Sequence, residues 1–158
     1  MPEEVVMEAR LNPYQVAPKT MQPMIEMAEK LAADGLEPGL HELVKIRASQ
    51  INGCAFCLHM HTSDARKHGE REERIYLLSA WRESRMFTPR ERAALAWTEA
   101  LTLITEGHAP DEVYAEVAQA FTPEEIVKLT LAITTINAWN RVAIGFRSVH
   151  PHDRPAAR

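Results

Sequence analysis

Residues 42–61 contain four side chains with redox or acid–base chemistry: Glu42, Cys54, Cys57 and His61. The two cysteines, the only ones in the chain, are three positions apart. On a helix, side chains with that spacing project from one face, with Cβ atoms about 5–6 Å apart. Two thiols at that distance can form a disulfide after a small adjustment of the backbone. The spacing therefore predicts a local, redox-active cysteine pair.

The position of the cysteines on a helix and a neighbouring base should activate the thiols. Asn52 and Gly53 accept positive φ and are expected to end one helix, so that both cysteines lie in the opening turns of the next. Free backbone N–H groups and the positive dipole end stabilise a thiolate there, which is the nucleophilic form. His61 follows Cys57 by four residues and should share its helix face, where it can take the thiol proton.

Glu42 is expected to approach His61 across a helical hairpin. If the helices before and after Asn52 and Gly53 fold back on each other, residues equally far from the turn face one another. Glu42 then comes level with position 62, next to His61. A carboxylate there would orient the imidazole and favour its protonated form. A nucleophile, a base and an orienting acid would then form one catalytic site.

Helical signals predominate from residue 20 onwards. We expect helices over residues 21–34, 38–52, 54–68, 70–82, 89–106, 111–120 and 123–148. Two of them begin with Phe-Thr-Pro and a Glu at the third helical position, which is a capping box. No stretch alternates apolar and polar residues as a half-buried strand does. The sequence therefore predicts an all-α fold, a compact bundle of about six to seven helices.

One domain is expected, because 158 residues with 46% hydrophobic content suffice for one core and leave little room for a second. We assign the polar, proline-containing residues 1–19 to an N-terminal arm, residues 20–150 to the helical domain and residues 151–158 to a flexible C-terminal tail. The helix over 123–148 is apolar nearly all round, so it should be central in the domain and shared with another subunit. This predicts an obligate homo-oligomer.

Charge and hydropathy argue against several classes of partner. The net charge is −4, so no basic field would attract nucleic acid or anionic lipid. The chain begins without the basic start and apolar run of a secretory signal, and no run of about eighteen uncharged apolar residues occurs. We therefore expect a cytoplasmic protein that binds neither nucleic acid nor membrane.

The four residues, with eleven, two and three residues between them, resemble the signature of a known family. The family is the carboxymuconolactone decarboxylase family, in its alkyl hydroperoxidase D-like branch. Residues 45–50 and 136–141 are also similar to members of that branch, and the similarity runs from about residue 11 to residue 147. One position departs from the pattern, because well-studied members have a second histidine between the cysteines where this chain has Phe56.

The resemblance implies an all-helical subunit, assembled as a homotrimer or homohexamer, that reduces small organic or hydrogen peroxides without a cofactor or metal. Carried over to this chain, Cys57 would be the peroxidatic thiol and Cys54 the more exposed resolving thiol. His61 and Glu42 would form the proton relay. The disulfide formed in each cycle would be reopened by an external dithiol on a lipoyl or thioredoxin-like protein, since the sequence has no glycine-rich dinucleotide loop.

Other functions fit parts of the pattern. The cysteine pair could serve a redox sensor or a dithiol–disulfide exchange module without peroxide turnover, and the chain could be a decarboxylase like other members of the wider family. The cysteines could also be ordinary core residues. A zinc site is a further alternative. Its ligands would be Cys54, Cys57, His61 and one of Glu42, His41 or His59.

Three residues near the end of the chain could line a substrate pocket: Trp139, Asn140 and Arg141. Core and subunit contacts of the last helix are the simpler interpretation of these residues.

Overall fold

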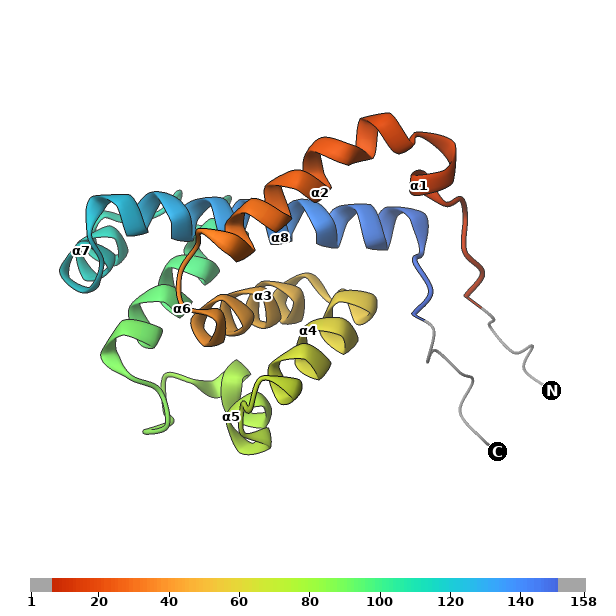
Figure 1. Ribbon diagram of the computed structural model, residues 1–158. Coiled ribbons are helices and arrows are strands. Elements are labelled where there is room, and N and C mark those ends of the chain that lie inside the picture. Colours follow the sequence, from red (N-terminus) through yellow and green to blue (C-terminus); the bar gives the residue numbers. More distant parts are fainter. Residues whose placement is uncertain (1–6, 151–158) are drawn as a thin grey trace.

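The computed structural model describes residues 7–150, and this part of the chain folds into helices without any strand (Figure 1). The helices are α1 (Pro13–Val16), α2 (Pro18–Ala33), α3 (Pro38–Asn52), α4 (Ala55–Lys67), α5 (Glu72–Leu77), the 3₁₀ helix η1 (Leu78–Ala80), α6 (Pro89–Thr102), α7 (Asp111–Ala120) and α8 (Pro123–Phe146). The predicted all-α class is confirmed. The start of the expected arm and the tail assigned to 151–158 lie outside the described residues.

The N-terminal part is more helical than predicted. Within the expected arm, Pro13–Val16 forms α1, so the described residues contain eight α-helices where six to seven were expected. Asn12 caps α1, its side-chain oxygen accepting a hydrogen bond from the Tyr14 amide at 3.0 Å. α2 begins at Pro18 rather than near residue 21. Both helices have proline in the first turn, where its missing N–H costs nothing, so these prolines start helices instead of preventing them.

Two helix ends also differ from the prediction. α5 ends at Leu77 and continues as the short 3₁₀ helix, instead of reaching residue 82. α6 ends at Thr102 rather than residue 106, because the backbone of Leu103 leaves the helical region with φ −97° and ψ 46°. The predicted capping boxes are confirmed at Thr88 and Thr122, each with both reciprocal hydrogen bonds to a glutamate.

α3 is held between two parts of the core. Figure 1 shows α8 running along the molecule, with α2 crossing it obliquely and the α3–α4 hairpin below it in this view. On one side of α3, Leu40 and Val44 pack against α6, α7 and α8. On another, Leu43 and Ile46 pack against α4, η1 and α6. Burying each such side chain contributes about 1.5–3 kcal/mol to the stability of the fold. The buried apolar residues therefore fix the position of α3 and of the polar residues between them.

An asparagine network joins the end of α3 to α8. The Asn52 side-chain amide donates hydrogen bonds to the side-chain oxygens of Asn137 and Asn140, both at 2.9 Å. Asn140 donates in turn to the Ser49 hydroxyl at 3.0 Å, and both of these residues are fully buried. Since buried polar groups are costly without partners, the network fixes the last turn of α3 against α8.

None of the helices in residues 7–150 is long and apolar enough to cross a membrane.

Candidate active site

The turn between α3 and α4 determines where the cysteines lie. Gly53 adopts φ 68°, a left-handed conformation that glycine takes without strain, and so ends α3 as predicted. The Gly53 amide donates to the Gln50 carbonyl at 3.3 Å, and the Cys54 amide donates to the Ser49 carbonyl at 3.0 Å. These two hydrogen bonds form a Schellman motif. The backbone of Cys54 therefore completes the end of one helix and begins the next.

Cys54 and Cys57 form a disulfide in this structure, with Cα atoms 5.4 Å apart. Cys54 is the N-cap of α4, and its Sγ accepts a hydrogen bond from the Cys57 amide at 3.4 Å. The expectation that Cys54 is the more exposed cysteine is wrong, because the exposed fractions are 1% for Cys54 and 2% for Cys57. Both cysteines pack against Ala143 of α8, with Phe56 beside them, and α8 therefore covers the bridge.

The hairpin brings Glu42 on α3 to His61 on α4. Glu42 Oε2 lies 3.3 Å from His61 Nδ1, and both atoms are buried without a hydrogen-bond partner elsewhere in the described residues. The other carboxylate oxygen of Glu42, Oε1, accepts a hydrogen bond from Lys45 Nζ at 2.8 Å. A single carboxylate thus connects an imidazole and an ammonium group.

The surroundings change the proton affinities of two of these groups. Burial raises the pKa of Glu42, but the neighbouring His61 and Lys45 outweigh burial and lower this pKa to about 2. Glu42 is therefore an anion at neutral pH. Burial and the nearby Lys45 charge lower the pKa of His41 to about 4, so its imidazole is neutral at that pH.

Acidification should destabilise the protein through His41 first. The folded pKa of about 4 lies below the ordinary value of 6.5, so between these values the unfolded chain binds a proton that the folded chain resists. The free energy of unfolding therefore falls as the pH drops from about 6.5 to about 4. We expect His41→Asn to remove about 2 kcal/mol of this loss, allowing for partial solvent access. Urea unfolding of the wild type and of the variant at several pH values measures this difference in the free energy of unfolding.

The matched control for that experiment is His68→Asn, because His68 is an exposed histidine at the end of α4. Its unfolding profile should follow the wild type from pH 7 to 4. Below about pH 4.5 all three proteins should lose the contribution of Glu42, whose folded pKa lies below its ordinary 4.5. If the free energy of unfolding of His41→Asn depends on pH above 4.5 as steeply as that of the wild type, His41 is not the group that causes the loss of stability.

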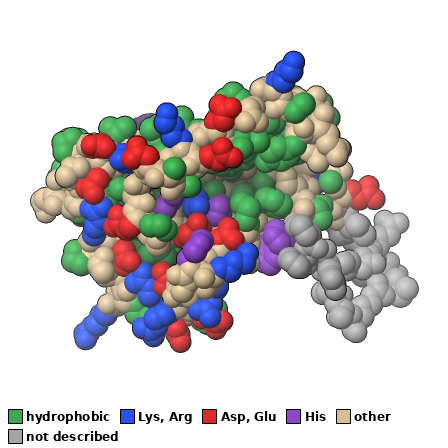
Figure 2. Space-filling model, in the orientation of Figure 1, with side chains coloured by type: hydrophobic (Ala, Val, Ile, Leu, Met, Phe, Trp, Pro, Cys, Tyr) green, Lys and Arg blue, Asp and Glu red, His purple; other side chains and the backbone are tan. Residues whose placement is uncertain are grey.

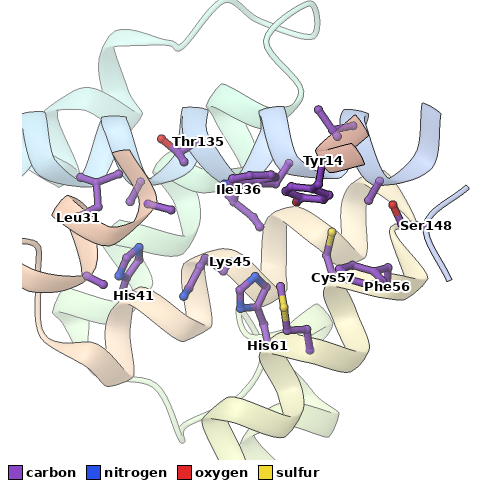
Figure 3. Close-up of a pocket in the computed structure, with 17 residues that line it drawn as sticks. Tyr14, Leu31, His41, Lys45, Phe56, Cys57, His61, Thr135, Ile136 and Ser148 are labelled. Carbon is purple, nitrogen blue, oxygen red and sulfur yellow. The ribbon is translucent and has the colours of Figure 1, made fainter. Parts of the chain in front are cut away.

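A cavity of about 330 Å³ lies beside these residues. Figure 3 shows His41, Lys45, His61 and Cys57 along one side of it, from α3 and α4. The opposite wall comes from α1, α2 and α8 and contains Tyr14, Leu31 and Ile136. Trp139 of α8 also lines the cavity and stacks on Tyr14. Cys57 and His61 therefore face the same cavity, whereas Cys54 and Glu42 are not among the residues that line it.

The model of the carboxymuconolactone decarboxylase family matches residues 18–100, which are more than half of the chain and include the segment from Glu42 to His61. The chain belongs to this family. The uncharacterized protein YdfG of Bacillus subtilis is 46% identical over 138 residues, or 87% of this chain and 94% of YdfG. The family match does not include α8, which supplies Ile136 and Trp139 to the cavity.

Solved structures place the chain in the alkyl hydroperoxidase D-like (AhpD-like) branch of the family, which confirms the resemblance. A protein of unknown function from Agrobacterium tumefaciens, suggested to be an antioxidant defence protein AhpD, is 44% identical with a TM-score of 0.89. The match covers 92% of this chain and 100% of that one. An uncharacterized peroxidase-related protein from Silicibacter sp. TM1040 has the same fold at 18% identity, with a TM-score of 0.76 over 86% of this chain and 72% of that one.

Some residues of this AhpD-like site could not be identified from the sequence motif. Lys45 and His41 line the cavity but do not belong to the four-residue motif. In the sequence, Lys45 follows Glu42 by about one helical turn and His41 directly precedes it, and this closeness of two bases to Glu42 is the signal that could have indicated them. Trp139 also lines the cavity, whereas Asn140 belongs to the buried asparagine network. In the described residues, no cluster of three or more His, Cys, Asp or Glu side chains is arranged to hold a metal ion.

Proposed function

We propose that this chain is a cysteine-based peroxidase that reduces small organic or hydrogen peroxides through Cys57 and Cys54. The observation that carries the proposal is the cavity with Cys57 and His61 on its wall and Glu42 paired with His61 behind it. A thiol and a base that face one cavity can act on the same small molecule. The Agrobacterium protein is suggested to act in antioxidant defence and the Silicibacter protein is described as peroxidase-related, which supports the same chemistry.

The proposed cycle transfers two electrons from an external dithiol to the peroxide. The Cys57 thiolate attacks one peroxide oxygen, so an S–O bond forms while the O–O bond breaks, and His61 protonates the departing alkoxide. The Cys54 thiol then condenses with the sulfenic acid: the S–S bond forms as the S–O bond breaks, and the thiol proton leaves with the hydroxyl group as water. The external dithiol reduces this disulfide to two thiols and becomes a disulfide itself. A lipoyl or thioredoxin-like protein is the class of reductant that we propose.

The role of each residue follows from its position. Cys57 is proposed as the peroxidatic thiol, because it lines the cavity that a peroxide would enter. Cys54 is proposed as the resolving thiol, because it contacts Cys57 and caps α4 without lining the cavity. Glu42 is proposed to orient His61, since its carboxylate lies 3.3 Å from the imidazole Nδ1.

The direct test is peroxide consumption by the whole protein with an excess of a small dithiol. We expect many moles of peroxide to be consumed per mole of protein, and a loss of both thiols when no dithiol is present. Oxidation that stops after one event under every reductant would instead indicate a redox sensor or exchange module. A zinc assay on the same sample distinguishes the metal-site alternative, and decarboxylation that continues with both cysteines replaced would indicate that activity.

We also propose that the subunit assembles into a homotrimer or homohexamer in the cytoplasm. The outward side of α8 supports assembly, because Val127, Leu131 and Ile144 are 58%, 39% and 46% exposed in the single chain. A cytoplasmic location suits thiols that must be reduced in each cycle. Sedimentation of the purified protein as a monomer would contradict the assembly.

A further inference from the structure

The cavity wall carries the positive side chain of Lys45 and no negative side chain from the described residues. The bases on it are His41, Lys45 and His61, and no Asp or Glu from the described residues lines it. The nearest carboxylate, Glu42, lies behind the wall and is engaged by Lys45 through one oxygen and by His61 through the other. A ligand in the cavity can therefore reach the Lys45 ammonium without meeting the Glu42 carboxylate.

Lys45 has hydrogen-bonding capacity left for a ligand. An ammonium carries three N–H donors, and the described residues provide one acceptor for Lys45, Glu42 Oε1 at 2.8 Å. The Lys45 side chain is only 19% exposed, so its charge acts in surroundings with little water. Charge-assisted hydrogen bonds to a carboxylate are strong under these conditions.

The rest of the cavity is apolar and large. Leu31, Ile136 and Trp139 form much of the opposite wall, and the Tyr14 ring stacks on Trp139 with centroids 6.4 Å apart. On the face shown in Figure 2, hydrophobic side chains line a hollow beneath α2, with histidine and Lys or Arg side chains at its lower edge. The 330 Å³ of the cavity equals roughly ten water volumes of about 30 Å³ each, far more than hydrogen peroxide needs.

We propose that the cavity binds the hydroperoxide of an apolar carboxylic acid, with the carboxylate at Lys45 and the hydroperoxide at Cys57. In Figure 3, Lys45 and His41 lie on one side of His61 and Cys57 lies on the other, along the same wall. A ligand lying along this wall has its charged group and its O–O bond on opposite sides of the imidazole. This inference rests on the proposed peroxidase function and names the substrate class for the same site.

The test compares two substrates that differ in the charge of one end and in a single methyl group, the hydroperoxide of a fatty acid and its methyl ester. For the wild type we expect kcat/KM to be at least about tenfold higher for the acid, because a charge-assisted hydrogen bond is lost with the ester. Lys45→Met should bring this ratio close to one, while Lys45→Arg should keep a preference for the acid. Lys45→Met also deprives Glu42 of a partner, which should lower kcat/KM for both substrates. The ratio of the two kcat/KM values therefore isolates the contact between Lys45 and the substrate carboxylate.

The matched control is Lys128→Met, because Lys128 pairs with Asp34 and Glu124 away from the cavity. Its acid-to-ester ratio should equal that of the wild type. A ratio near one in the wild type, or an unchanged ratio in Lys45→Met, would overturn the proposal.

A binding measurement separates this inference from the peroxidase function. Calorimetric titration with decanoate and with decanol needs no turnover. Decanoate should bind the wild type at least about tenfold more tightly than it binds Lys45→Met, whereas decanol should bind both alike. Decanoate binding without any peroxide turnover would refute the proposed function and keep the ligand class. Turnover of hydroperoxides with no preference for the acid and no decanoate binding would refute the ligand class alone.

Discussion

Cys57→Ser is expected to abolish multiple-turnover peroxide consumption, with a fall of at least about 10³-fold, as when the nucleophile of another enzyme is removed. Serine has nearly the same shape but is not an effective nucleophile towards a peroxide oxygen at neutral pH. Cys57 lines the cavity, so no other thiol of the chain faces a peroxide bound there. The measurement is the rate of peroxide loss in the presence of excess dithiol.

Cys54→Ser is the matched comparison, because either replacement removes the same disulfide. Any loss of stability from breaking the bridge is therefore shared by both variants. Cys54→Ser should still reduce one peroxide per chain and then stop at the sulfenic acid of Cys57, which a carbon-nucleophile probe traps. If the trapped sulfenic acid forms on Cys54 in the Cys57→Ser variant instead, the two thiols have the opposite roles.

His61→Asn should lower kcat/KM for peroxide by about 10²-fold or more, the usual contribution of a positioned acid–base group. The imidazole faces the same cavity as Cys57, and no other base follows Cys57 by one helical turn. Asparagine keeps a polar side chain opposite Glu42 but cannot transfer a proton at neutral pH. The rate of thiolate formation, read from ultraviolet absorbance of the reduced protein, should fall together with turnover.

Two further variants test whether His61 acts with Glu42. Glu42→Gln keeps the size of the side chain and removes its charge, so it should lower the rate by about tenfold, less than the loss of the imidazole. His68→Asn removes an exposed histidine from the end of the same helix and should leave the rate unchanged. Equal rates for His61→Asn and His68→Asn would remove His61 from the mechanism.

The elements that depend on local signals could be predicted from the sequence. Gly53 ends α3 because its φ of 68° suits glycine, and Thr88 and Thr122 begin helices through hydrogen bonds within four residues. The approach of Glu42 to His61 also follows from a local hairpin, in which the residue count from the turn sets which side chains meet. These features need no knowledge of how distant helices pack.

The shape and lining of the cavity could not be predicted in the same way. Tyr14 and Trp139 are more than a hundred positions apart, and their rings meet only because α1 and α8 pack together. The burial of Cys54 likewise depends on Ala143 of α8, which no pattern near the cysteines indicates. Lys45 is close in sequence to Glu42, but a lysine on a helix is usually solvated, and its place on the cavity wall emerges only from tertiary packing.

The asparagine network limits how this site can be transplanted. Ser49, Asn52 and Asn140 do not belong to the Glu–Cys–Cys–His motif, and Asn140 is 88 positions from Asn52. A hairpin grafted with only the four motif residues would lack the amides and the hydroxyl that anchor its turn to a neighbouring helix. With Asn137, the second acceptor of the Asn52 amide, an engineer who moves this chemistry to another scaffold would need to carry four more side chains, two of them from α8.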